Sequence, residues 1–138
     1  MCELCDARGE NWRFICETEH SFCVICKWPL KVGHVLVLPK KCISQKNISL
    51  LSPDECYDLN CLVQKMEDTL NKLGDEDVIT FKNSNSHSTQ VHFHFHLLPS
   101  KGALRDLFSS YENIAKRSNM SKKDELEMKN LICDNLID

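Results

Sequence analysis

The sequence predicts an α+β fold in which one long helix packs on a mainly antiparallel sheet. Short β-prone apolar segments recur along residues 1–100, and a single long amphipathic helix interrupts them without regular strand–helix–strand repeats. After residue 101 the composition changes, and charged helical patterns follow. We therefore expect a single domain over 1–138, with a core over 1–100 and a helical C-terminal extension over 101–138.

Five segments have the composition of β-strands. Residues 21–27 are almost wholly apolar and are expected in the middle of the sheet, because a central strand is covered on both faces. Pro39 and Pro99 are expected to end the strands that they follow, since proline donates no ladder hydrogen bond. The expected strands are residues 12–17, 21–27, 34–38, 77–82 and 89–98.

The long helix is expected over residues 49–73. Ser52 is a suitable N-cap, Pro53 fits the first helical position, and Glu55 completes a capping box. Gly74 is expected to end the helix. An apolar stripe recurs at helical spacing in Leu59, Leu62, Val63, Met66 and Leu70. A short turn is expected over residues 1–8, and two charged helices over 103–116 and 122–136.

Composition narrows the function classes. The 138 residues are 42% hydrophobic and 27% charged, which is ordinary for a soluble globular chain. The net charge is −3 without a dominant basic patch, so duplex nucleic acid is not an expected partner. No secretory signal and no apolar run near the roughly 20 residues of a membrane span are visible, so we expect a cytoplasmic protein without membrane contact.

Three of the six histidines, His92, His94 and His96, alternate with large apolar residues. Successive side chains of a strand point to opposite faces, so the imidazoles are expected on one face and the Phe and Leu side chains between them on the core face. Imidazoles spaced about 7 Å apart suit separate roles better than one shared metal ion. A histidine can attack phosphorus covalently when its reactive nitrogen is unprotonated and its other nitrogen is hydrogen-bonded.

The nine cysteines are expected to be reduced, buried or metal-bound rather than paired in disulfides, because no signal peptide is apparent. Cys2 and Cys5 form a Cys-x-x-Cys pair, which is half of a tetrahedral zinc site. The alternative is an unmetallated pair in a frayed terminus. Six other cysteines are expected to be small buried hydrophobic residues: Cys16, Cys23, Cys26, Cys56, Cys61 and Cys133.

The histidine segment resembles the signature of the histidine-triad family of nucleotide hydrolases and transferases. Residues 32–41, a Gly-His pair followed by an apolar strand and Pro-Lys, resemble a second segment of that family. The resemblance implies a HIT-like five-stranded, mainly antiparallel sheet with one long helix. It also implies a nucleotide or nucleotide conjugate as ligand, and a homodimer.

The resemblance also implies catalytic roles. The middle histidine, His94, would be the nucleophile that forms a covalent nucleotide intermediate. His96 would contact the phosphate or the leaving group, and His34 would support the triad. The implied reaction cleaves a phosphoanhydride or phosphoramidate in a nucleotide conjugate, such as a dinucleoside polyphosphate or a nucleoside phosphoramidate. The alternative is a nucleotide-binding or zinc-dependent scaffold protein with little turnover.

One branch of the family holds structural zinc on an N-terminal Cys pair, a histidine after Pro-Lys, and the first triad histidine. The matching positions here are Cys2, Cys5, Cys42 and His92. Cys42 replaces the usual histidine, and because cysteine is equally a zinc ligand, the implied site is Cys3His. Such an ion would order the site from behind and would not act as the Lewis acid.

Substrate contacts are also suggested by the resemblance. The family often places an acidic or amide residue on the ribose, three positions before the loop proline, where this chain has Cys26, a weak hydrogen-bond partner. Trp28 can stack on a base or pack around it. The loop before the triad usually contacts the α-phosphate; the candidates are Asn83, Ser88, Thr89 and Gln90, each with a solvated turn as the alternative.

Overall fold

The structure is a computed structural model that describes residues 2–74, 76–84, 91–115, 117 and 119–137. The chain divides into two compact units, Met1–Lys101 and Gly102–Asp138, which are described separately. A single domain over the whole chain stays a prediction.

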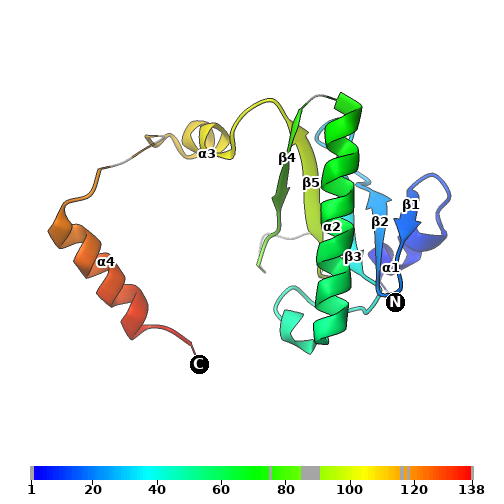
Figure 1. Ribbon diagram of the computed structural model, residues 1–138, viewed down its shortest axis with the longest axis horizontal. Helices are drawn as coiled ribbons and strands as arrows, with labels where there is room; N and C mark the ends of the chain where they lie inside the picture. Colours follow the sequence, from blue (N-terminus) through cyan, green and yellow to red (C-terminus); the bar gives the residue numbers. More distant parts are fainter. Residues whose placement is uncertain (1, 75, 85–90, 116, 118, 138) are drawn as a thin grey trace. The chain divides into compact units, whose positions relative to one another are not determined.

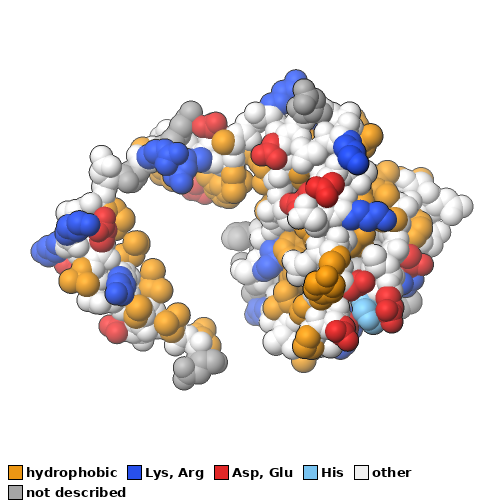
Figure 2. All heavy atoms as spheres, viewed as in Figure 1, with side chains coloured by type: hydrophobic (Ala, Val, Ile, Leu, Met, Phe, Trp, Pro, Cys, Tyr) orange, Lys and Arg blue, Asp and Glu red, His pale blue; other side chains and the backbone are white. Residues whose placement is uncertain are grey.

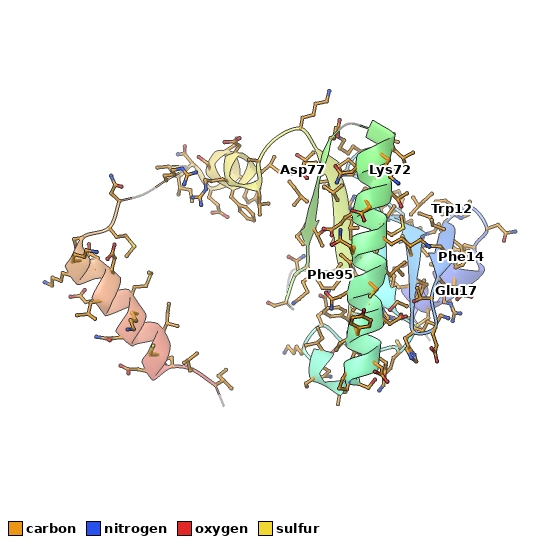
Figure 3. All side chains as sticks on the ribbon, in the orientation of Figure 1. Trp12, Phe14, Glu17, Lys72, Asp77 and Phe95 are labelled. Carbon is orange, nitrogen blue, oxygen red and sulfur yellow. The ribbon has the colours of Figure 1, made fainter. Side chains whose placement is uncertain are left out.

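The first unit is built on one five-stranded antiparallel sheet with the order β1-β2-β3-β5-β4 (Figure 1), which confirms the predicted α+β fold. In Figure 3, Phe14 and Glu17 mark the edge strand β1, and Asp77 marks the opposite edge strand β4. The strands are β1 (Phe14–Glu17), β2 (Ser21–Ile25), β3 (Val35–Pro39), β4 (Asp77–Phe81) and β5 (Phe95–Ser100).

The histidine segment differs most from the expected strand. Regular pairing begins at Phe95 rather than near residue 89, and His92 lies in an isolated bridge with Ser44. Pro99 does not end the strand either, because it lies inside β5 opposite Val78. Since β3 pairs with β5 from Phe95 to Leu97, Pro99 lies past the β3 pairing, where its missing N–H is tolerated.

Helix α2 (Pro53–Gly74) packs on one face of the sheet (Figure 1). The predicted capping box is confirmed: the Glu55 amide donates to Ser52 Oγ at 3.1 Å, and the Ser52 amide donates to Glu55 Oε1 at 3.3 Å. The helix begins at Pro53 rather than residue 49, because the 3-10 helix η2 (Ile48–Leu50) precedes it. The predicted apolar stripe is buried: Leu59, Leu62, Val63, Met66 and Leu70.

Both faces of the central strands are covered, which explains their almost continuous apolar sequence. Where a turn was expected over residues 1–8, the described residues form the short helix α1 (Glu3–Asp6) and the start of the 3-10 helix η1 (Ala7–Gly9), and these cover the face opposite α2. The layer under α2 includes Cys23, Val35, Val37, Phe93 and Leu97; the opposite layer comprises Leu4, Ala7, Phe22, Val24, Leu36 and Leu38. The histidine-bearing face is therefore the one that α1 covers.

Gly33 is required by the turn that leads into β3. Its φ is +93°, and a Cβ there would lie 2.8 Å from Pro99 Cγ. We expect Gly33→Ala to lower the free energy of unfolding by about 2 kcal/mol, because both the backbone and the contact with Pro99 become strained. Urea unfolding measures the loss. Gly9→Ala is the matched control, since its Cβ would meet nothing within 4 Å; equal effects of the two substitutions would contradict this prediction.

The second unit contains α3 (Leu104–Glu112) and α4 (Lys122–Asp134), close to the two expected helices. Apolar side chains are exposed along α4 (Figure 2), among them Leu126, Leu131 and Ile132. Among the described residues, no helix is long and apolar enough to cross a membrane. Of the six non-ligand cysteines expected to be buried, Cys23 is buried, Cys16, Cys26 and Cys56 are half-buried, and Cys61 and Cys133 are exposed, so the expectation is wrong for these last two.

Candidate active site and metal centre

His94 and His96 line a pocket of about 220 Å³ on the sheet face opposite α2. The predicted alternation of faces is confirmed, because Phe93 and Leu97 are buried in the α2 layer while the two imidazoles border the pocket. Strand β3 contributes Leu36, which lies opposite His96 in the sheet register. The lining residues are Glu3, Leu4, Arg13, Cys26, Lys27, Trp28, Leu36, His94 and His96.

The His94 ring is held in one tautomer. Its Nδ1 lies 2.7 Å from the His92 carbonyl oxygen, which can only accept, so Nδ1 carries the proton and donates. Burial lowers the pKa of His94, so the ring is neutral near pH 7. The lone pair of a neutral ring protonated at Nδ1 is on Nε2, and this is the nitrogen available for attack.

His34 and His96 form a directed hydrogen-bond chain. His34 Nδ1 accepts from the Leu30 amide at 3.1 Å, so the proton of His34 is on Nε2 and is donated to His96 Nδ1 at 3.0 Å. Burial, with smaller contributions from His94 and His34, lowers the pKa of His96 to about 4. Neutral His96 therefore carries its own proton on Nε2 and is a hydrogen-bond donor. The predicted supporting position of His34 matches this contact.

Phe81 restricts the orientation of the His96 ring, and the sequence alone did not indicate it. Phe81 lies opposite His96 on β4, and the two rings stack at a centroid distance of 4.8 Å and an interplanar angle of 8°. The His94 and His96 rings meet edge to face at 4.9 Å. His96 is thus fixed by a ring stack and a hydrogen bond together.

We expect His34→Ala to release the tautomer of His96, because the N–H donor to its Nδ1 is lost. The ¹⁵N chemical shifts of the His96 ring should change from a single tautomer to a mixture. Turnover should fall about tenfold to 100-fold, since only part of the population still presents the Nε2 proton. His20→Ala, a half-exposed histidine outside the pocket, is the control. A His96 ring that keeps its tautomer in His34→Ala would contradict the assignment.

Four side chains form a second cluster beside the pocket. The ligand atoms of Cys2, Cys5, Cys42 and His92 all lie within 4.8 Å of one another, so the predicted metal ligands are brought together. Cys2 Sγ is 3.5 Å from Cys5 Sγ and 3.8 Å from Cys42 Sγ, and His92 Nδ1 is 3.3 Å from Cys2 Sγ and 3.4 Å from Cys5 Sγ. This cluster can hold a metal ion.

The donor chemistry of the cluster fits a tetrahedral ion. His92 Nε2 donates to the Pro39 carbonyl oxygen at 2.9 Å, which leaves the Nδ1 lone pair facing the sulfurs. Ligands of a tetrahedral zinc site with Zn–S near 2.3 Å lie roughly 3.8 Å apart, close to the sulfur separations found here. Burial alone would raise the pKa of the Cys2 thiol. Hydrogen bonds with Cys5 and Cys42 outweigh this effect, so the pKa of Cys2 is lowered. Burial and the nearby Cys2 raise the pKa of Cys5 to about 12.

His92 joins the two sites. Its ring belongs to the cysteine cluster, and its backbone carbonyl accepts the Nδ1 proton of His94. An ion bound to the His92 ring would therefore also order the His92 carbonyl oxygen, which selects the tautomer of His94.

The remaining predicted contacts divide into three cases. Trp28 lines the pocket with 82% of its surface exposed. Asn83 is exposed, follows the end of β4 at Phe81, and is not one of the residues that line this pocket, so its predicted contact with the α-phosphate stays a prediction. Ser88, Thr89 and Gln90 lie outside the described residues. Arg13 and Lys27 also line the pocket, although no sequence motif singled them out.

The fold and parts of the sequence match known proteins. The Dictyostelium discoideum protein named bis(5′-adenosyl)-triphosphatase is 32% identical over 87 residues, covering 61% of this chain and 57% of that protein. The chain thus spans little more than half the length of this curated relative. A HIT family protein from Bacillus subtilis has a TM-score of 0.70 at 18% identity, covering 99% of this chain and 98% of that chain.

A HIT-like protein from Bartonella henselae has a TM-score of 0.55 at 27% identity, covering 67% of this chain and 72% of that chain. A sequence model of the HIT domain matches residues 9–103, which include the predicted catalytic histidines His34, His94 and His96. Because this match extends over more than half of the sequence, the chain belongs to the HIT domain family.

Proposed function

We propose that the protein is a hydrolase or nucleotidyltransferase that cleaves a phosphoanhydride or phosphoramidate bond in a nucleotide conjugate through a covalent intermediate on His94. The observation that carries the proposal is the state of His94: its Nδ1 is bound to the His92 carbonyl, and its Nε2 has a lone pair in a ring that borders a pocket. The family match and the name of the Dictyostelium relative support chemistry at phosphorus.

In the first step, His94 Nε2 attacks the α-phosphorus of the conjugate. The new N–P bond forms as the bond from phosphorus to the leaving oxygen or nitrogen breaks, and the electron pair goes to the leaving group. The Nδ1–H bond to the His92 carbonyl stabilises the positive charge that develops on the ring. His96 Nε2–H donates a hydrogen bond to a phosphoryl oxygen or to the leaving atom and keeps its proton, and the leaving group takes its proton from solvent.

In the second step, water attacks the same phosphorus. An O–P bond forms, the N–P bond breaks, the electron pair returns to His94 Nε2, and the water proton passes to solvent. The product is a nucleoside monophosphate, and an alcohol or phosphate acceptor in place of water would make the reaction a transfer. His94 must be neutral before it attacks, and His96 stays neutral through both steps, which its low pKa favours.

We propose zinc as the ion of the Cys3His cluster, because three sulfurs and one imidazole nitrogen are the ligand set of structural zinc sites. When bound, zinc would supply a closed structural cross-link rather than Lewis-acid catalysis. The residues holding it are Cys2, Cys5, Cys42 and His92, which would tie the N-terminus to the residues before β5. A homodimer and a cytoplasmic location stay predictions.

The proposal is tested by incubating the full chain with adenosine 5′-phosphoramidate and, separately, with diadenosine triphosphate. Formation of AMP, together with a transient adduct of one AMP unit on the intact protein by mass spectrometry, is the expected result. Peptide mapping should place the adduct on His94. A zinc-loaded, folded protein that binds AMP but forms neither product nor adduct would favour the scaffold alternative.

A further inference from the structure

Arg13 is a buried cation in the wall of the proposed active-site pocket, and the two-step reaction above does not use it. Its side chain is 1% exposed, and it lines the pocket together with His94 and His96. Its backbone pairs with Ile25, whose amide donates to the Arg13 carbonyl at 2.8 Å, while Arg13 Nε donates to the Ile25 carbonyl at 3.1 Å. The guanidinium is thus held beside the start of the Cys26–Trp28 segment.

One nitrogen of this guanidinium has unmet hydrogen-bonding capacity. Within the described residues, Arg13 Nη1 is buried without a hydrogen-bond partner. The nearest carboxylate oxygens belong to Glu10 at 3.6 Å and Glu3 at 3.8 Å, which attract the charge but are beyond hydrogen-bond distance. A buried polar group of this kind is uncommon and calls for a partner.

The charges around Arg13 indicate what kind of partner fits. Lys27 Nζ lies 3.4 Å from the same Glu3 carboxylate, so in the ion pairs between described residues here two cations face two carboxylates. A second phosphate would add an unmatched negative charge at this end of the pocket. A neutral acceptor, such as a hydroxyl oxygen or a base oxygen or nitrogen, would use the Nη1 donor without disturbing the balance.

The other walls at this end also suit a nucleoside rather than a polyphosphate. Leu4 and Leu36 are apolar, and Trp28 presents an exposed aromatic face for stacking. Cys26, which lines the same pocket, is a weak hydrogen-bond partner and offers little specificity for hydroxyl groups. Arg13 therefore supplies the stronger donor at this end.

We propose that Arg13 is a specificity-determining residue that binds the nucleoside end of the substrate by donating from Nη1 to a neutral acceptor of the ribose or the base. This inference rests on the proposed function, because it assumes that the phosphorus of the substrate lies next to His94.

The test measures the affinities of AMP, ribose 5-phosphate and inorganic phosphate for the wild-type chain and for Arg13→Met and Arg13→Lys, by calorimetry and by NMR titration. Arg13→Lys keeps the positive charge between Glu3 and Glu10 but loses the forked donors of the guanidinium. It therefore still tests the inference if Arg13→Met does not fold. Arg8→Met is the matched control, because Arg8 pairs with Glu17 outside the pocket.

Both Arg13 variants should bind AMP about tenfold to 100-fold more weakly than the wild type, with phosphate affinity unchanged, since a hydrogen bond from a charged donor is lost. Loss of affinity for ribose 5-phosphate as well assigns the acceptor to the ribose, and loss for AMP alone assigns it to the base. Wild-type AMP affinity in folded Arg13→Lys and Arg13→Met would overturn the inference, as would an equal loss of AMP and phosphate binding. Arg13-dependent AMP binding without turnover of any conjugate would instead overturn the proposed function alone.

Discussion

Replacing His94 by alanine is expected to lower turnover of a nucleotide conjugate by at least about 10³-fold, because the attacking nitrogen is removed and water must act directly on phosphorus. The covalent adduct should disappear with it. Steady-state kinetics and intact mass spectrometry measure the two effects. The fold should survive, since His94 borders a pocket that can accept the loss of a ring.

Two further variants test whether the loss of turnover is due to the missing His94 ring. His94→Gly leaves space for free imidazole, which should restore part of the turnover by attacking phosphorus in place of the missing ring. His20→Ala removes a histidine outside the pocket and should keep wild-type rates. Full activity in His94→Ala would show that the reaction does not proceed through His94, and would refute the covalent mechanism.

Removing the metal is expected to produce the largest loss of stability. Free zinc at a thousandfold excess over its dissociation constant would stabilise the folded chain by about 4 kcal/mol, because the unfolded chain does not hold the four ligands together. A strong chelator should therefore lower the melting temperature, and readdition of zinc should restore it. Metal analysis of the purified chain should find one zinc per chain.

Cysteine-to-serine substitutions show which thiols bind zinc and contribute to the stability. Cys2→Ser and Cys5→Ser should each lose zinc and lower the melting temperature, whereas Cys61→Ser and Cys133→Ser alter exposed thiols outside the cluster and should do neither. Metal-free protein should also show a mixed tautomer at His94, since the carbonyl that accepts from its Nδ1 belongs to His92, a residue of the proposed metal cluster. A chelator-treated chain with unchanged melting temperature and unchanged His94 tautomer would contradict the structural role.

Much of the fold could be predicted because its signals are local. The capping box of Ser52 and Glu55 and the apolar stripe of α2 depend on spacings of three and four residues, which the helix geometry converts directly into a capped, buried face. The period of two in the histidine segment likewise separated the imidazoles from Phe93 and Leu97.

Other features depend on residues far apart in the chain, and no local pattern specifies them. The pairing of β3 with β5 stops at Val37 and Phe95 although β3 continues to Pro39, and the stack of Phe81 on His96 follows from the register with β4. The burial of Arg13 in the pocket wall likewise depends on its pairing with Ile25.

The sequence by itself determined the α+β class, the capped helix, the alternation of the histidines and the Cys2-Cys5 pair, since each follows from residue type and short-range spacing. The addition of Cys42 and His92 to that pair came from the family resemblance, and the fold brings the four side chains together. Tertiary structure alone decided which nitrogen of each ring carries the proton. The Leu30 amide sets the tautomer of His34, and the His92 carbonyl sets that of His94. A tautomer is selected by the hydrogen-bond partner that the folded backbone presents, and that partner is defined only once strands and loops are in place.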